Sequence, residues 1–267
     1  HPLPSLSSSS SPLTLYPHSH PRPHPGALKW TTLGWGEAGG WSLDLSAPAP
    51  RVDAFKWLQP RRMTTICRRW DTSRRDALQH AWFNGVGYVA WENVWGIWNQ
   101  LTPRDGEALR RLQPLMHYLG AAGLLTDGWE PHTPTVQHGS VFASKFVTGL
   151  DSDKVGSTGR VPCMRHTAWT LVERLGKEWG ASSAMLVLDA ASFAGCRFYD
   201  IYHGRLLYPR ADGASGKLVL AFQIEAYGYG GVLAAAAFRE GRRLEGLDAL
   251  LNLQVRSGQV RSGQVKS

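Results

Sequence analysis

Residues 82–99 read WFNGVGYVAWENVWGIWN, and no other stretch of the chain says as much about its fold. Glycines at positions 85 and 87 separate apolar residues, which is typical of a buried strand that opens into a loop. We therefore expect a strand over residues 84–91. The stretch also holds four tryptophans and a single acid, Glu92.

An acid among aromatic rings is the pattern of a cleft that binds or cleaves a sugar. Pyranose faces stack on indole rings, and a carboxylate in an apolar wall can hold a raised pKa for acid catalysis. The alternative is a buried aromatic strand in which Glu92 only bonds backbone. Trp91, Trp95 and Trp98 would share one face of a helix, where core packing competes with sugar stacking.

The segments around this stretch follow the order of a βα unit. Residues 52–80 have an amphipathic, mostly helical pattern. Thr102 is a good N-cap, Pro103 suits the first helical position, and Asp105 completes a T-x-x-D capping pattern. A strand, an aromatic loop and a capped helix in this order indicate a βα unit.

The pattern changes after Pro134 to short strand-like runs between Gly, Ser and Asp clusters. The clearest is 217–226, in which apolar residues alternate with a mixed set. Five such runs predict a small antiparallel sandwich; they span 141–147, 168–173, 185–188, 197–202 and 217–226. At the two ends, residues 1–27 are rich in Ser, Pro and His and predict disorder, and residues 239–267 predict a polar low-complexity tail.

These motifs resemble a glycoside-hydrolase-like (β/α)8 barrel family with a C-terminal β-sandwich. The resemblance covers roughly residues 52–235, and some relatives carry a sulfatase-modifying domain after the same two domains. The barrel motifs are DAFKW at 53–57, ALQH at 77–80, FNGVGY at 83–88, WENVWGIWN at 91–99, TPRD at 102–105 and WEPHTPT at 129–135. The sandwich motifs are WTLV at 169–172, FYDIYHG at 198–204 and FQIEAYGYG at 222–230.

The resemblance implies an α/β plus all-β fold, with a partial (β/α)8-type barrel remnant over 28–135 and a small antiparallel β-sandwich over 136–238. A whole barrel takes about 250 residues, so we expect its N-terminal strands to lie outside this sequence. The implied activity is hydrolysis of O-glycosidic bonds. It usually needs two carboxylates from different strands, so we expect the site to be incomplete. The alternatives are a non-catalytic carbohydrate-binding or structural fragment, and a broken piece of a longer gene product.

Two acids are candidate catalytic residues, Glu92 and Glu130. Glu130 follows Trp129 and precedes His132 by two positions, and this cluster could instead anchor a loop. The candidate substrate-binding residues have aromatic or hydrogen-bonding side chains in or beside these motifs: Trp91, Trp95, Trp98, Asn84, Tyr88, Trp129 and His132.

The expected partner is carbohydrate. The net charge of +8 comes largely from residues 51–75, where apolar and acidic residues interrupt the basic ones; this favours a solvated helix face over a nucleic-acid surface. No run reaches the roughly 18 apolar residues of a membrane span. We therefore expect neither a nucleic-acid nor a membrane partner, and the sequence leaves the oligomeric state open.

We expect no metal and no cofactor. His132 and His138 lack a third ligand, Asp200 and His203 fit structural bonding in a strand and turn, and no phosphate or dinucleotide fingerprint occurs. The three cysteines are far apart and offer no disulfide framework, which weakly favours a reducing compartment. The sequence otherwise leaves the localisation open.

Overall fold

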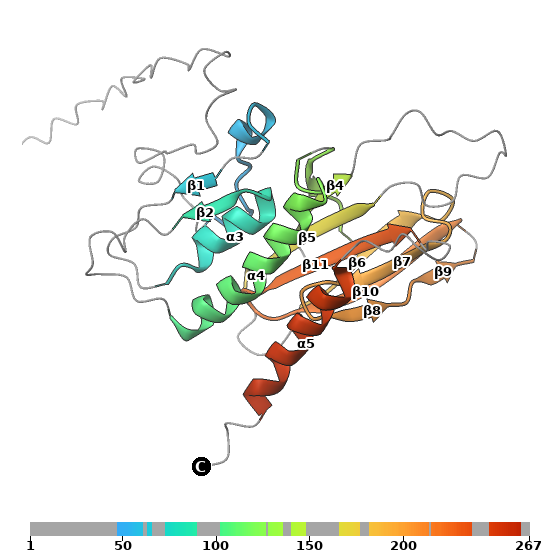
Figure 1. Ribbon diagram of the computed structural model, residues 1–267. Coiled ribbons are helices and arrows are strands. Elements are labelled where there is room, and N and C mark those ends of the chain that lie inside the picture. Colours follow the sequence, from blue (N-terminus) through green and yellow to red (C-terminus); the bar gives the residue numbers. More distant parts are fainter. Residues whose placement is uncertain are drawn as a thin grey trace, which may run out of the picture. The chain divides into compact units, whose positions relative to one another are not determined.

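The computed structural model describes residues 47–60, 63–65, 73–89, 102–126, 128–135, 140–147, 166–176, 182–213, 215–236 and 246–262 (Figure 1). The helical elements are η1 (Ala54–Trp57), α3 (Arg75–Asn84), α4 (Pro103–Ala121) and α5 (Leu247–Ser262). The strands are β1 (Met63–Thr65), β2 (Gly87–Val89), β3 (Glu130–Thr133), β4 (Val141–Val147), β5 (Thr167–Glu173), β6 (Ser182–Asp189), β7 (Cys196–Asp200), β8 (Arg205–Leu207), β9 (Arg210–Asp212), β10 (Lys217–Ile224) and β11 (Tyr229–Ala236).

Two antiparallel sheets make up most of the described structure. The larger has six strands in the order β3-β4-β5-β11-β7-β8, and the smaller has the order β6-β10-β9. In the central strand β5, Trp169 and Leu171 point to one face, while Ala168 and Val172 point to the other. All seven residues of β5 are buried, because both faces of the six-stranded sheet are covered.

A different apolar core lies on each face of the six-stranded sheet. One face packs against β6 and β10, and this core includes Trp169, Leu171, Leu186, Leu220 and Phe222. The other face packs against the helices α3, α4 and α5, and this core includes Trp82, Leu115, Phe146, Val172, Leu233 and Leu250. The result is a layer of helices on one side of a two-sheet sandwich.

Helix α3 is fixed to the sheet by side chains that bond the backbone of strands or of the turns beside them. Trp82 Nε1 donates to Gly230 O at 2.8 Å, and Gln79 Nε2 donates to Glu173 O at 2.8 Å. In the opposite direction, Thr170 Oγ1 donates to the Phe83 carbonyl at 3.2 Å. These bonds satisfy buried polar groups while α3 packs on the sheet.

Helix α4 begins where the sequence predicts it. Thr102 Oγ1 accepts from Asp105 N at 3.1 Å and donates to Asp105 Oδ2 at 2.8 Å, and Pro103 is the first helical residue. The face that α4 turns to the sheet is apolar, with Ala108, Leu112, Leu115 and Leu119 buried.

The predicted fold class is wrong. Among the described residues no barrel closes, and the single parallel strand pair is β1 with β2. Residues 28–135 do not stand apart as a barrel remnant, because α3 and α4 share one core with β4, β5 and β11. A βα order along the chain is a local signal, whereas the surface on which a helix packs is set by residues far away in sequence.

Strand β11 is absent from the sequence-based prediction, although it lies between β5 and β7 in the sheet. Its paired glycines resemble a loop, but the close packing of Ile201 and of α3 requires one of them. A Cβ on Gly231 would lie 2.8 Å from Ile201 and 3.2 Å from Trp82. Here a glycine marks a close approach inside a strand.

The predicted low-complexity tail is also different in the structure, because α5 occupies residues 247–262. Leu247 and Leu250 are buried in the helical core, and Gln254 Nε2 donates to Arg111 O at 3.0 Å on α4. Gly204 has φ +74° and faces α5, where a Cβ would lie 2.4 Å from Leu251 O. No helix in the described part of the chain is long and apolar enough to span a membrane.

Candidate functional site

Four of the predicted catalytic and substrate-binding residues lie in a part of the chain that the structure does not describe. Glu92, Trp91, Trp95 and Trp98 fall within residues 90–101, outside the described residues. Their predicted roles stay predictions. The other candidates, from Asn84 to His132, lie on described elements.

Asn84 was predicted to bind substrate, but it lies in the protein interior at the end of α3. Its Oδ1 accepts from Asp53 N at 2.9 Å, while its Nδ2 donates to Arg51 O at 2.9 Å and to His80 O at 2.8 Å. The side chain therefore ties the segment before η1 to α3. It offers no accessible surface to a sugar in this structure.

Trp129, just before β3, forms part of an aromatic surface. Its ring centroid lies 4.7 Å from that of Trp57 in η1, with the planes inclined by 41°. Trp57 is 57% exposed, and Phe55 in the same turn is also exposed. We call Trp57 and Trp129 the aromatic platform.

The sequence-based candidates do not include Phe55 and Trp57. The pattern over residues 52–80 predicts a mostly helical run, but residues 54–57 form a 3-10 turn. Asp53 caps this turn, because its Oδ1 accepts from Phe55 N at 3.2 Å. The two rings stand two positions apart. This spacing does not fit one face of a helix, so it could have indicated that these residues are not part of an amphipathic helix.

Lys56 fixes the 3-10 turn η1, which carries Trp57, through hydrogen bonds on its buried side. It is 1% exposed, and its Nζ donates to Leu125 O at 2.6 Å, Gly85 O at 3.0 Å and Pro60 O at 3.1 Å. The Nζ atom also lies 5.6 Å from the centroid of Trp129. Burial lowers the pKa of the Lys56 ammonium group to about 8, against the opposing effect of Asp53.

Glu130, predicted as a catalytic acid, stands on β3 beside the platform. Its carboxylate forms an ion pair with Lys145, the residue opposite on β4, and half of the Glu130 side chain is exposed. His132 lies two positions further on, and its Nε2 donates to Pro50 O at 2.9 Å. The His132 ring packs against Phe83, with centroids 4.9 Å apart, so these contacts of His132 are those of a loop anchor.

Tyr88, the last of the described candidates, is on β2 and away from the ion pair. It lines an apolar cavity between α3, β2 and α4. The structure thus brings Trp129 and Glu130 together and buries Asn84. Tyr88 lies elsewhere, in the wall of the cavity between α3, β2 and α4.

Asp200 and His203 bond to each other at the end of β7. Asp200 Oδ2 accepts from His203 Nδ1 at 2.8 Å and from Arg205 Nε at 3.0 Å, and its Oδ1 accepts from His203 N at 3.0 Å. Within the described residues, no group of three or more His, Cys, Asp or Glu side chains could hold a metal ion.

Cys196, at the start of β7, is disulfide-bonded. This corrects the expectation that the three cysteines form no disulfide. The other two, Cys67 and Cys163, lie outside the described residues. The number and spacing of the cysteines do not predict a single disulfide, because sequence spacing does not show which residues the fold brings together.

Comparison with known proteins adds no relative. No family model, curated protein or solved structure matches the chain. The resemblance to glycoside-hydrolase-like barrel proteins therefore rests on the sequence motifs alone.

Proposed function

We propose that this protein binds carbohydrate without cleaving it, and that the aromatic platform is the binding surface. The observation that carries the proposal is the contact between the rings of Trp57 and Trp129, with Trp57 more than half exposed. The C–H groups on one face of a pyranose carry partial positive charge, and the face of an indole ring is negative. Adjacent indole rings can therefore hold adjacent sugar units.

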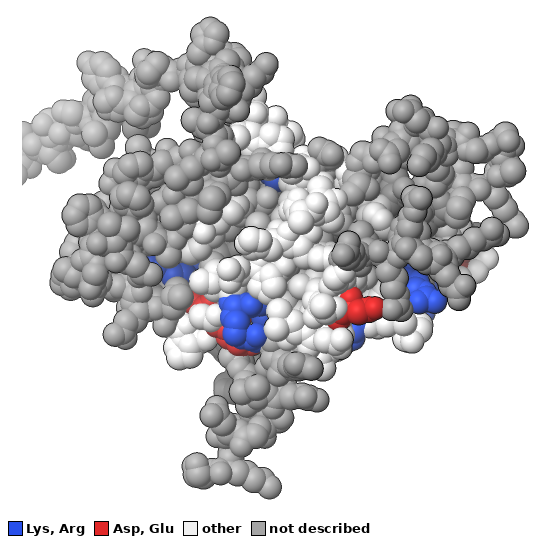
Figure 2. All heavy atoms as spheres, viewed as in Figure 1, with Lys and Arg blue, Asp and Glu red and all other residues white. Residues whose placement is uncertain are grey.

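The surroundings of the platform suit a ligand that is neutral and rich in hydroxyl groups. Figure 2 shows that most of the described surface on this face of the molecule is uncharged. Exposed aromatic groups that gather in one place often mark a binding surface. The three bonds of Lys56 hold the turn that carries Trp57, so the rings are ordered before a ligand arrives, which lowers the entropic cost of binding.

The ion pair beside Trp129 favours binding over hydrolysis. Glu130 and Lys145 are both partly exposed, so they can exchange hydrogen bonds with sugar hydroxyl groups. A glycosidase acid must keep its proton, and it does so in an apolar environment. Glu130 is instead half exposed and forms an ion pair with Lys145.

The test is a glycan panel measured by calorimetry against the full chain and variants. Trp57→Ala should weaken binding of the best ligand at least tenfold, and Trp57→Phe should keep part of the affinity. Tyr208→Ala is the matched control, because Tyr208 is an 80% exposed aromatic residue between β8 and β9. Should wild type bind no glycan, or should Trp57→Ala bind as tightly as wild type, the proposal fails.

Hydrolysis of O-glycosidic bonds is the second candidate, supported by the sequence motif around Glu92. It predicts that wild type releases reducing sugar from a glycan and that Glu92→Gln does not. Glu225→Gln is the control, because Glu225 is an exposed acid that is not a candidate for catalysis. Equal rates for wild type and Glu92→Gln would remove Glu92 from catalysis.

A further inference from the structure

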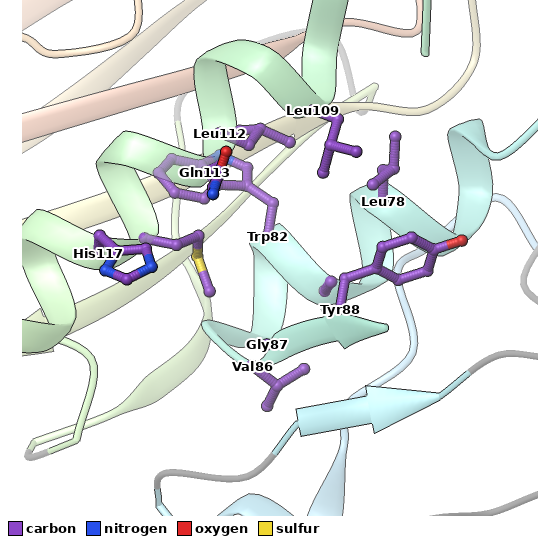
Figure 3. Close-up of a pocket in the computed structure, with 11 residues that line it drawn as sticks. Leu78, Trp82, Val86, Gly87, Tyr88, Leu109, Leu112, Gln113 and His117 are labelled. Carbon is purple, nitrogen blue, oxygen red and sulfur yellow. The ribbon is translucent and has the colours of Figure 1, made fainter. Parts of the chain in front are cut away.

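A second hollow lies between α3, β2 and α4, lined by residues that the proposed function does not use. Its volume is about 260 Å³ (Figure 3). Leu78 and Trp82 come from α3, Tyr88 from β2, and Leu112 and Met116 from α4. Most of the lining is therefore aliphatic, aromatic or thioether carbon and sulfur.

The inner wall is apolar and held in place. Trp82 is 1% exposed, and its only polar side-chain atom donates to Gly230 O at 2.8 Å. Leu78 and Leu112 are buried beside it. A ligand that reaches this wall meets carbon surface and no free donor or acceptor from these three side chains.

Two polar side chains stand at the rim of the same hollow. Gln113 and His117 are one helical turn apart on α4, and both line the hollow; Figure 3 shows Gln113 beside Trp82. Both residues are exposed, so the hollow reaches solvent there. Neither side chain forms a hydrogen bond within the described part of the chain, so each can bond an incoming group.

The size of the hollow sets the class of ligand. An apolar cavity of about 150 Å³ holds one benzene molecule, so about 260 Å³ has room for two fused rings. Met116 can adapt to the shape of such a ligand, because its side chain is unbranched and flexible. A ligand that covers the apolar lining removes that surface from water, which favours binding.

We propose that this hollow binds a planar aromatic alcohol of bicyclic size. The rings contact Trp82, Leu112 and Met116, and the hydroxyl group bonds Gln113 or His117 at the rim. This site is separate from the aromatic platform and does not depend on the carbohydrate proposal.

The experiment uses 2-naphthol and naphthalene as probes, with ligand-observed NMR and calorimetry on the full chain. The two probes share one ring system and differ by one hydroxyl group. Wild type should bind both, 2-naphthol more tightly. Replacing both rim residues, Gln113→Leu with His117→Leu, should weaken 2-naphthol at least fivefold and leave naphthalene nearly unchanged.

A cavity-filling variant tests the location. Met116→Trp should weaken both probes at least tenfold while the melting temperature stays equal or rises, since added apolar volume fills the hollow. Trp57→Ala should leave both affinities unchanged, which separates this site from the platform. The proposal is overturned if wild type binds neither probe, as when the chain's own residues fill the hollow. It is also overturned if the rim variant binds 2-naphthol like wild type.

Discussion

At the scale of single residues, Lys56 is a buried cation whose role is to satisfy backbone carbonyls. Its ammonium group has three oxygen acceptors from three separate segments, at Pro60, Gly85 and Leu125. Lys56→Met keeps the volume of the chain but leaves these acceptors without the lysine donor. We expect the free energy of unfolding to fall by about 3 kcal/mol, measured by urea denaturation at pH 7.

The control for this change is Lys217→Met on β10, where the lysine is exposed. That variant should unfold within about 0.5 kcal/mol of wild type. The weakened turn should also cost glycan affinity, because Lys56 supports the residues of the platform. If Lys56→Met matches the control in stability, the ammonium group does not hold the three segments together.

Asp200 gives the molecule a defined dependence on acid. Burial tends to raise the pKa of the Asp200 carboxyl, but the hydrogen bonds and charge of His203, with the charge of Arg205, outweigh it and lower the pKa. The unfolded chain has the ordinary value of about 3.9. The folded state therefore binds fewer protons in this range, and the stability from Asp200 is present above about pH 4 and lost as the pH falls through the lower folded value.

Asp200→Asn should lower the free energy of unfolding at pH 7 by about 1–3 kcal/mol, because a buried charge-assisted network is broken. The gap between wild type and variant should close as the pH falls below about 4, as measured by urea denaturation from pH 2.5 to 7. Asp212→Asn on β9, where the residue is exposed, serves as control. A gap that is constant across this range would contradict the lowered pKa.

At the scale of elements, α5 tests whether the end of the described chain belongs to the core. Leu250 is 6% exposed and Leu253 is 46% exposed, although they are three residues apart on one helix. Leu250→Ala should lower the free energy of unfolding by about 2–4 kcal/mol, since a buried methyl-rich side chain is lost. Leu253→Ala should cost well under half as much. Equal small effects in both variants would indicate that α5 does not pack on α4.

Elements with a strong local pattern were predictable from the sequence. The strand-like run at 141–147 coincides with β4, the alternation over 217–226 predicts β10, and the Thr102 cap starts α4. β11 is not predicted because Gly231 resembles a loop residue, whereas a glycine is needed there for the close approach of Ile201 and of Trp82 on α3. Likewise, the sequence suggests that Asn84 is available for a ligand, because two of its partners, Arg51 and Asp53, lie more than 30 residues away in sequence. Local patterns do not report such distant partners.

At the scale of the whole molecule, the predicted elements were assembled into the wrong architecture. The helical segments and the strands were assigned to two domains, but α3 and α4 bury their apolar faces on β5 and β11. An apolar face of a sheet needs a cover, and β5 has no polar face that would mark one side as solvated. A strand that is buried on both faces therefore lies in the middle of three layers, and the helices of the same chain form one of the outer layers.

Cys196, at the start of β7, takes part in a disulfide. With three cysteines in the sequence, its partner within one chain is Cys67 or Cys163, and one thiol stays free. Peptide mapping without reduction should find one linked pair that contains Cys196. Reduction should lower the free energy of unfolding by about 2–4 kcal/mol, because a cross-link restricts the unfolded chain. Alkylation of all three cysteines in the unfolded, unreduced protein would contradict the bond, and the reducing compartment would again be the better expectation.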